Sequence, residues 1–270
     1  MGEHEGYLRI ATSSGFNGNY VTVLKNEGAA LKIVGKVDDI APGEDIKAVR
    51  FVGDRGYVVT FKKIDPLFVL DMSDPEDPVV TGELKVPGFS TYLHLLDREH
   101  LIGLGKDGDD QGAFAWFQGL KLSLFDVADS STPKEDSSVT IGSRGTMSPA
   151  FDDHLAFTFD RETGLLALPL TLCEGTKGGS KVGSFSYNGV QVYNISANGG
   201  ISMVGEIKDT TAADAGNGNY YSLCNGWNYT GNIQRTVILK DGAANHIATI
   251  ALDGVKIYTL GGEIESSVSW

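Results

Sequence analysis

The sequence has few cysteines, few basic residues and no long apolar run. Its only cysteines, Cys173 and Cys224, lie far apart, which excludes a CxxC metal or redox motif. Lys and Arg number 22 against 35 Asp and Glu, so the formal net charge is −13. No basic cluster is long enough to follow a phosphate backbone, and no segment reaches the ~18 to 20 apolar residues of a membrane helix. We expect neither a nucleic-acid partner nor a transmembrane segment.

Complete catalytic motifs are also missing. The chain has no HExxH, nucleophile elbow or P-loop, and no Ser, His and Asp in the order of a known triad. We therefore predict no cofactor and no catalytic residues.

Glycine, by contrast, is abundant: 35 of 270 residues, about twice the usual ~7%. Apolar residues alternate or run in short stretches bounded by Gly, Pro, Asp and Ser, which is typical of strands and turns. Helical periodicity is nearly absent. The composition predicts an all-β protein rich in turns.

A repeat runs along the chain. Segments 65–84 and 120–139 share the frame Asp-x-x-Asp-x-x-x-Pro, which begins at Asp71 and at Asp126. A third copy, 190–207, has Asn194 in the first position. In each copy the first acid or amide should end the third strand and cap the following turn, and Pro should open the fourth strand. We interpret these acids as structural.

Repeats of this length predict a β-propeller. A β-sandwich is the main alternative, but its strands would not share an internal frame. We expect one domain of about five four-stranded antiparallel blades, or the C-terminal part of a larger propeller. The first blade should begin at its second strand, 7–12, and the last has a weakly marked fourth strand, 265–270. The expected blades are approximately 7–37, 47–86, 91–141, 149–208 and 233–270.

Several segments resemble a known family. GDRGYVVTFKKIDPLFVLDMSDPEDP, GELKVPGFSTYLH, GLKLSLFDVAD and GVQVYNIS are similar to the bacterial and archaeal family of secreted proteins with a C-terminal β-propeller domain. GYLRIATSSG near the start resembles an internal stretch of longer members, which implies that this chain is about the C-terminal half of such a domain. The resemblance also implies export and a surface or envelope setting, and it carries no established reaction. Segment 210–232 matches no pattern of the family.

These observations favour a non-enzymatic extracellular or cell-envelope module that binds or scaffolds a protein or glycan partner. The alternative is a carbohydrate-active enzyme, a hydrolase or lyase with an axial carboxylate and histidine site. No secretory signal precedes the first strand, so we expect it to have been removed or to lie in a longer precursor. If the propeller is incomplete, two copies could cover each other's open edges as a homodimer.

Aromatic residues in two expected inter-strand loops are the leading candidates for a binding surface. Such residues form flat platforms for sugars or protein partners, but they could equally cover the core beneath long insertions. The candidates are Trp116, Phe117, Tyr220, Tyr221 and Trp227.

Two histidines form a second group of candidates. His94 and His154 stand in comparable first strands, which line the axis of a propeller, and Asp153 precedes His154. Two imidazoles beside a carboxylate could bind a partner or a metal. We favour structural, hydrogen-bonded histidines and predict that they do not form a metal site.

The remaining candidates are a calcium loop and a disulfide. Asp107, Asp109 and Gln111 resemble the start of a calcium loop, but Gln118 stands where the bidentate acid should be, so an acidic solvated loop is favoured. Cys173 and Cys224, both in loop-like sequence, could form a disulfide worth on the order of 4 kcal/mol in an exported protein or remain two free thiols.

Overall fold

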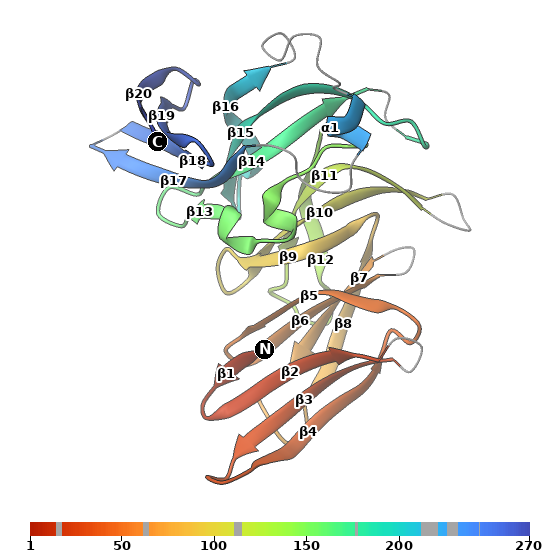
Figure 1. Ribbon diagram of the computed structural model, residues 1–270. Helices are drawn as coiled ribbons and strands as arrows, with labels where there is room; N and C mark the ends of the chain where they lie inside the picture. The colour runs from red at the N-terminus through yellow and green to blue at the C-terminus, as the bar shows by residue number, and fades with distance from the viewer. Residues whose placement is uncertain are drawn as a thin grey trace. The chain divides into compact units, whose positions relative to one another are not determined.

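The computed structural model consists mainly of β-strands (Figure 1). It describes residues 1–14, 18–61, 65–110, 115–175, 178–211, 221–225, 232–242 and 244–270. These residues form five four-stranded sheets, and consecutive strands within them pair antiparallel. The prediction of an all-β fold built from about five four-stranded units is confirmed.

The chain divides into two compact units. The first comprises Met1–Ala115 and Ser123–Asp136, and the second comprises Trp116–Leu122 and Ser137–Trp270.

The first unit holds two whole sheets, ordered β1-β2-β3-β4 and β5-β6-β7-β8. Strands β9 and β10 and the ends of β11 and β12 also belong to it, from a third sheet ordered β12-β11-β10-β9. The bounds are β1 Gly2–His4, β2 Tyr7–Ser13, β3 Asn19–Asn26, β4 Leu31–Ile40, β5 Asp45–Val52, β6 Arg55–Phe61, β7 Asp65–Asp71, β8 Val79–Val86, β9 Phe89–Leu95, β10 His100–Asp110, β11 Ala115–Asp126 and β12 Lys134–Ile141.

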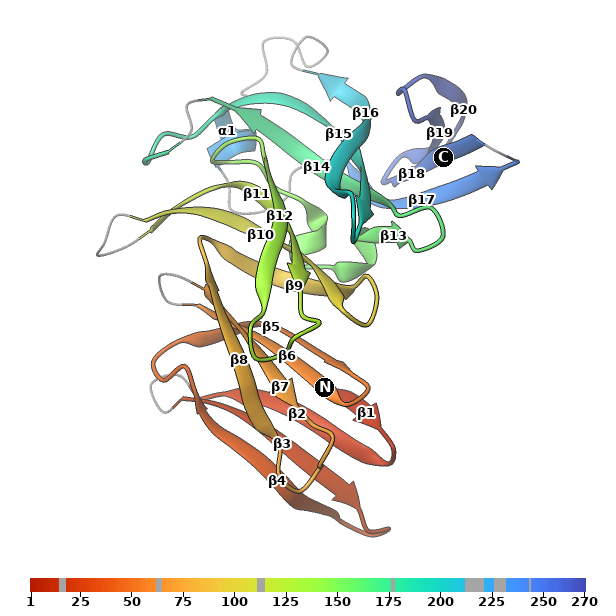
Figure 2. The ribbon, with the colours of Figure 1, turned by 180° about the vertical axis from the view of Figure 1, so that it is seen from behind.

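The second unit holds the sheets β13-β14-β15-β16 and β17-β18-β19-β20 (Figure 2). Two short 3-10 helices precede β13, and a five-residue helix follows β16 in the chain. The bounds are η2 Pro149–Phe151, η3 His154–Ala156, β13 Thr158–Asp160, β14 Leu165–Glu174, β15 Ser184–Ser196, β16 Gly200–Thr211, α1 Tyr221–Asn225, β17 Ile233–Asp241, β18 Ala244–Ala251, β19 Gly254–Thr259 and β20 Ile264–Ser269.

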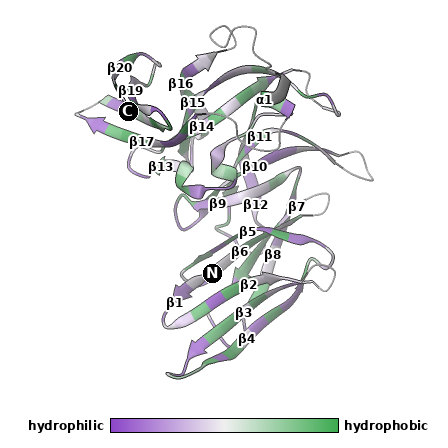
Figure 3. Ribbon diagram, in the orientation of Figure 1, coloured by the Kyte–Doolittle hydropathy of each residue, from purple (hydrophilic) through white to green (hydrophobic). Residues whose placement is uncertain are grey.

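The strands follow from the apolar pattern. In β3 the buried positions alternate with half-buried ones, so Val21 and Val23 point into the core of the first unit while their neighbours face the other side. Strand β14 is buried along nearly its whole length and reads as a continuous apolar run. Hydrophobic stretches within strands such as β3 and β17 are visible in Figure 3.

The repeated frame forms the turn between the third and fourth strands. Asp71, the last residue of β7, accepts a hydrogen bond from the Ser73 N–H at 2.9 Å. Asp126 ends β11 and accepts from the Ala128 N–H at 2.8 Å. In the second and third sheets the next strand begins directly after the frame's proline. The structural interpretation of these two acids is confirmed. The prediction was wrong for Asn194, which lies inside β15 and donates from Nδ2 to the Thr163 carbonyl oxygen at 3.1 Å instead of ending the strand.

A glycine in the fourth strand of one sheet packs against this turn in the next sheet. A Cβ added at Gly35 of β4 would overlap the Pro75 carbonyl oxygen, and one added at Gly82 of β8 would overlap the Ser130 carbonyl oxygen. In the second unit, Gly205 of β16 stands in the same way against the carbonyl of Leu260, after β19. Only glycine allows the two backbones to approach so closely.

The structure corrects the expected ends of the repeat. The first sheet does not lack its first strand, because β1 pairs with β2 from Gly2↔Arg9 to His4↔Tyr7. The last sheet has a complete fourth strand, since β20 pairs with β19. Within the expected blade 149–208, the apolar residues of 150–159 also predict a first strand, whereas η2 and η3 occupy most of that segment and only β13 is extended. Pro149 and the capping side chains of Ser148 and Asp153, which accept from the N–H groups of Ala150 and Leu155, explain that error.

Among the described residues, no helix is both long and apolar enough to cross a membrane.

Candidate functional site

Two adjoining cavities lie in the first unit, around the turn between β5 and β6. One has a volume of about 320 Å³ and the other about 430 Å³. They share Gly53, Asp54 and Arg98 in their linings. The first is otherwise lined by His4, Glu5, Tyr7, Arg9, Met72, Ser73 and Pro75, and the second by Val52, Arg55, Tyr57, Leu95 and Glu99. We call the two cavities together the turn groove.

Arg9, on β2, is a buried cation in the wall of the turn groove. Its side chain is only 3% exposed. Nη1 donates to the carbonyl oxygen of Gly53 and Nη2 makes a long contact, 3.5 Å, with the carbonyl oxygen of Met72. The arginine therefore ties the first sheet to the second. Burial lowers the pKa of Arg9, and the charges of Asp54 and Glu5 oppose this shift only in part.

Arg55 repeats this arrangement one sheet further along. It opens β6, and its Nη1 and Nη2 donate to the carbonyl oxygens of Val127 at 2.5 Å and Ala128 at 3.4 Å. Met72 and Val127 hold the same place in the repeat, one residue after the acid that ends the third strand. Hydrogen bonds from Ser73 lower the pKa of Asp71, and the charge of Arg55 adds to this effect.

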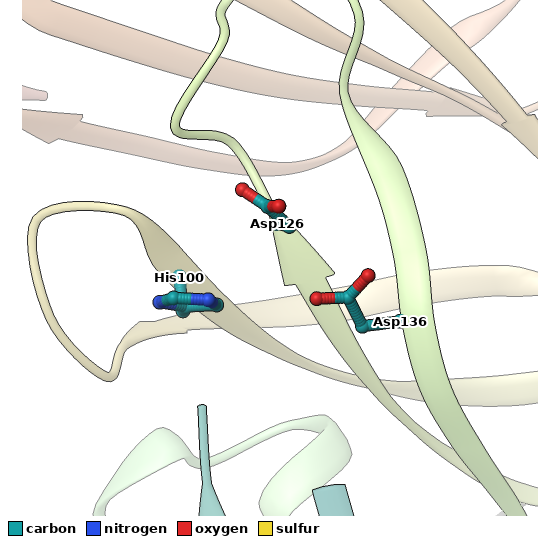
Figure 4. A group of neighbouring side chains, drawn as sticks. All are labelled: His100, Asp126 and Asp136. Atoms are coloured by element: carbon teal, nitrogen blue, oxygen red, sulfur yellow. The ribbon is translucent and has the colours of Figure 1, made fainter. Parts of the chain in front are cut away.

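A group with ligand atoms suited to a metal ion lies in the third sheet. One nitrogen of His100 and one oxygen each of Asp126 and Asp136 are within 4.8 Å of one another (Figure 4). Imidazole and carboxylate ligands of this kind suit Zn²⁺ or Mn²⁺. The Lys134 ammonium, however, lies 3.0 Å from Asp126 Oδ2 and 3.4 Å from Asp136 Oδ1. A cation from the chain itself therefore balances this carboxylate pair.

Hydrogen bonds and ion pairs surround the members of this group. His100 Nδ1 is 2.9 Å from Asp97 Oδ1, which leaves Nε2 with the lone pair when Nδ1 carries the proton. Burial raises the pKa of Asp97, but hydrogen bonds from His100 and from the Glu99 N–H outweigh this and hold it below its ordinary value. The Ala128 N–H and then Lys134 lower the pKa of Asp126. The group is thus part of a cluster of hydrogen bonds and ion pairs.

The histidine candidates lie in different units and each has its own partners. His94, on β9 of the first unit, has Nδ1 3.2 Å from the hydroxyl of Tyr92. Asp153 and His154 lie at the start of η3 in the second unit, and not in a first strand as predicted. Asp153 accepts from the Leu155 N–H at 3.0 Å and forms an ion pair with Arg235. These contacts, that with Leu155 first, lower the pKa of Asp153.

The aromatic candidates are only partly within the described residues. Trp116 and Phe117 belong to strand β11 and not to a loop, which corrects the prediction. Arg144 lies over the Trp116 ring, 4.9 Å from its centre, and donates to the Phe117 carbonyl oxygen at 3.0 Å. Tyr221 begins α1, but its side chain, like Tyr220 and Trp227, lies outside the described residues.

The calcium candidates do not lie in a loop. Asp107 and Asp109 lie near the end of β10, half-buried, so the prediction of an acidic solvated loop was wrong at these positions. Asp107 Oδ1 accepts from the Gly108 N–H at 3.0 Å. Alternate residues of a strand point to the same face at a spacing of about 7 Å, so they do not wrap around an ion as the residues of a loop do. Gln111 lies outside the described residues.

Cys173 and Cys224 are joined by a disulfide in the second unit, with their Cα atoms 6.0 Å apart. Neither lies in a loop: Cys173 is in β14 and Cys224 in α1. Both are buried together with Phe185, and the bond fastens the short helix to the sheet.

Sequence reasoning missed the arginines of the turn groove. Arg9 and Arg55 each stand in the second strand of a repeat. A charged residue between apolar ones was the available signal for Arg9. Arg55 follows Gly53 and Asp54 and resembles part of the turn. Their partners are backbone carbonyl groups, which every residue has, so the sequence does not indicate which of them an arginine contacts.

Two archaeal proteins are similar to part of this chain. An uncharacterised protein of Methanocaldococcus jannaschii is 41% identical over 172 residues, which cover 63% of this chain and 26% of that protein. An uncharacterised protein of Archaeoglobus fulgidus is 40% identical over 169 residues, covering 63% and 25% respectively. The aligned part is thus about a quarter of each relative's length.

Among solved structures, that of Sqt1 from Saccharomyces cerevisiae matches with a TM-score of 0.43 and 10% identity, over 84% of this chain and 48% of that one. The model of the beta propeller domain family matches residues 1–261. Together with the five four-stranded sheets, this match shows that the chain belongs to the beta propeller domain family.

Proposed function

We propose that this chain is a binding module that holds a peptide segment of a protein partner in the turn groove. The observation that carries the proposal is the pair of adjoining cavities with three residues in common. Together they offer a site in which a part near Arg9 adjoins a part whose lining includes Val52 and Leu95 beside charged residues. The side chains of an extended peptide can alternate between polar and apolar, so a peptide can place one of each kind in the two parts of the site.

The linings support a peptide more than a glycan. Sugar recognition uses open aromatic faces. Tyr57 is 1% exposed, and the Lys25 ammonium covers one face of Tyr7 at 5.9 Å from the ring centre. The arginines, in contrast, are suited to the carboxylate and carbonyl groups of a peptide.

We further propose that the module works outside the cytoplasm, in the extracellular space or the cell envelope. The Cys173–Cys224 disulfide supports this, because such bonds persist mainly in oxidising compartments. Fractionation of the source cells, with the redox state of the two cysteines determined in each fraction, tests the location.

Peptide display with the folded chain as bait tests the groove. Asp54 is exposed and lines both cavities, so Asp54→Trp should block them and weaken the selected peptides by about tenfold or more. Asp45→Trp is the matched control, because Asp45 is exposed on β5 of the same unit and lines neither cavity. Peptides that bind Asp54→Trp as well as the wild type, or a selection that yields no binder, would contradict the proposal.

A further inference from the structure

The charge of Arg9 is incompletely balanced within the turn groove. No ion pair of Arg9 occurs among the described residues, and its Nε is buried without a hydrogen-bond acceptor in that part of the chain. Its two terminal nitrogens have only neutral carbonyl partners, one of them at 3.5 Å. A buried guanidinium without an anion in contact is costly, because it has lost its water. An anion in the cavity that Arg9 lines would therefore interact more favourably with the protein than an anion at the surface.

A second guanidinium borders the same cavity. Arg98, in the turn between β9 and β10, is exposed and lines both parts of the groove. In the described part of the chain it also has no ion-pair partner within 4.0 Å. An anion in the cavity would thus have one buried and one adaptable arginine nearby.

We propose that the cavity lined by Arg9 and Arg98 takes the carboxylate of an acidic residue of the bound peptide. This inference rests on the peptide-binding function proposed above and names the chemical group recognised. The carboxylate accepts from the weakly engaged Nη2 of Arg9 and from Arg98.

The lining also selects the type of anion. Glu5 and Asp54 border the same cavity, so a phosphate with nearly two charges would be repelled more strongly than a carboxylate with one. A volume of about 320 Å³ holds an acidic side chain with its backbone. Because the whole chain carries a net charge of −13, the attraction must come from contact inside the groove and not from the overall field.

The test measures NMR chemical-shift titrations with three probes: N-acetyl-Glu-Val-amide, the uncharged N-acetyl-Gln-Val-amide, and acetate. The Glu peptide should shift the amide signals of residues that line the groove and bind about tenfold more tightly than the Gln peptide. It should also bind more tightly than acetate, since only the peptide is long enough to contact Val52 and Leu95 as well. Equal affinity of the Glu and Gln peptides would overturn the inference, and acetate binding as tightly as the Glu peptide would assign the site to a free carboxylate instead.

Variants separate this site from a general charge effect. Arg98→Gln should weaken the Glu peptide about threefold to fivefold. Lys47→Gln removes the same charge from an exposed position on β5 outside the groove and should leave the affinity unchanged. Arg9→Lys, if it folds, should weaken binding further, and since Arg98 is exposed its variant tests the proposal even if Arg9→Lys does not fold. Equal effects of Arg98→Gln and Lys47→Gln would contradict the inference.

The display experiment distinguishes the two proposals. Suppose that Asp54→Trp prevents binding of the selected peptides but that these peptides contain no essential Asp or Glu. This result would support peptide binding in the turn groove and contradict the carboxylate specificity. If no peptide depends on Asp54, both fail.

Discussion

Arg55 of one sheet donates a 2.5 Å hydrogen bond to the carbonyl oxygen of Val127, which follows the third strand of the next sheet. The same guanidinium reaches Ala128 at 3.4 Å. A side chain in one repeat thereby holds the backbone of another in place. A carbonyl oxygen cannot be removed by substitution, so the arginine is the partner whose replacement tests this contact.

Replacing this arginine by lysine should destabilise the first unit. Arg55→Lys keeps the charge but loses the planar fork that reaches two carbonyl oxygens, so we expect a loss of about 1 kcal/mol in the free energy of unfolding. Urea titration followed by circular dichroism measures it. Lys47→Arg, at an exposed position, is the control. An unchanged midpoint for Arg55→Lys would show that the contact contributes nothing to stability.

A methyl group at Gly82 should separate two sheets. In Gly82→Ala the new Cβ meets the Ser130 carbonyl oxygen and the Pro133 ring, so we expect destabilisation by about 1 to 3 kcal/mol. Gly261→Ala is the matched control, because its nearest neighbour would be 3.6 Å away. Thermal unfolding of both variants gives the comparison. Similar melting temperatures for the two would contradict the close approach at Gly82.

The acid that ends β11 should make stability depend on pH. The pKa of Asp126 is lowered from 3.8 in the folded chain, so its charge stabilises the fold above that value and the contribution is lost as pH falls through the folded pKa. Asp126→Asn keeps an oxygen for the Ala128 N–H but does not titrate. Below about pH 4 the variant should therefore lose less stability than the wild type. Parallel pH profiles of the unfolding midpoint for the two proteins would disprove this.

Removing the disulfide should destabilise the second unit. The bond closes a loop with a sequence separation of 51, and loop-closure entropy gives a contribution of ~4 kcal/mol. We expect the double variant Cys173→Ala and Cys224→Ala to unfold at a lower temperature in calorimetry, as should the wild type after reduction. Wild-type protein that carries two titratable thiols under non-reducing conditions would rule the bond out.

Lys134 should control metal binding by the third sheet. In Lys134→Met the two carboxylates lose the ammonium within 3.4 Å, so Zn²⁺ should bind at least about tenfold more tightly than to the wild type. Calorimetric titration measures the difference. Adding His100→Ala to the Lys134→Met variant should abolish the gain. Equal Zn²⁺ affinity of wild type and Lys134→Met would mean that the ammonium does not compete.

The sequence predicted the parts of the fold that rest on local chemistry. The frame at Asp71 and Asp126 predicted both the turns and the strand order, because an Asx cap and a proline act within a few residues. Strand β1 was missed, since three polar residues show no apolar alternation and pair only because β2 is already in place. The 3-10 turns at 149–156 were missed because the apolar residues of this segment resemble those of a strand.

The candidate site was harder to predict than the fold. Arg9, Asp54 and Arg98 come from three separate segments, and no spacing rule connects them. Trp116 was a candidate because it was expected in an inter-strand loop, yet it belongs to strand β11. Contacts from a side chain to a distant backbone depend on how the sheets pack, which a sequence pattern reports only indirectly.

The glycine contact is asymmetric: in the first, second and fourth sheets the fourth-strand glycine receives a turn, and that turn follows the third strand of the next sheet. A head-to-tail interface of this kind does not limit the number of repeats that can be joined in a row. Duplication or loss of a whole repeat would leave every remaining contact of this type intact. An insertion in the Asp-x-x-Asp-x-x-x-Pro turn, in contrast, would damage the neighbour that receives it, so changes in length should accumulate in other turns of the chain.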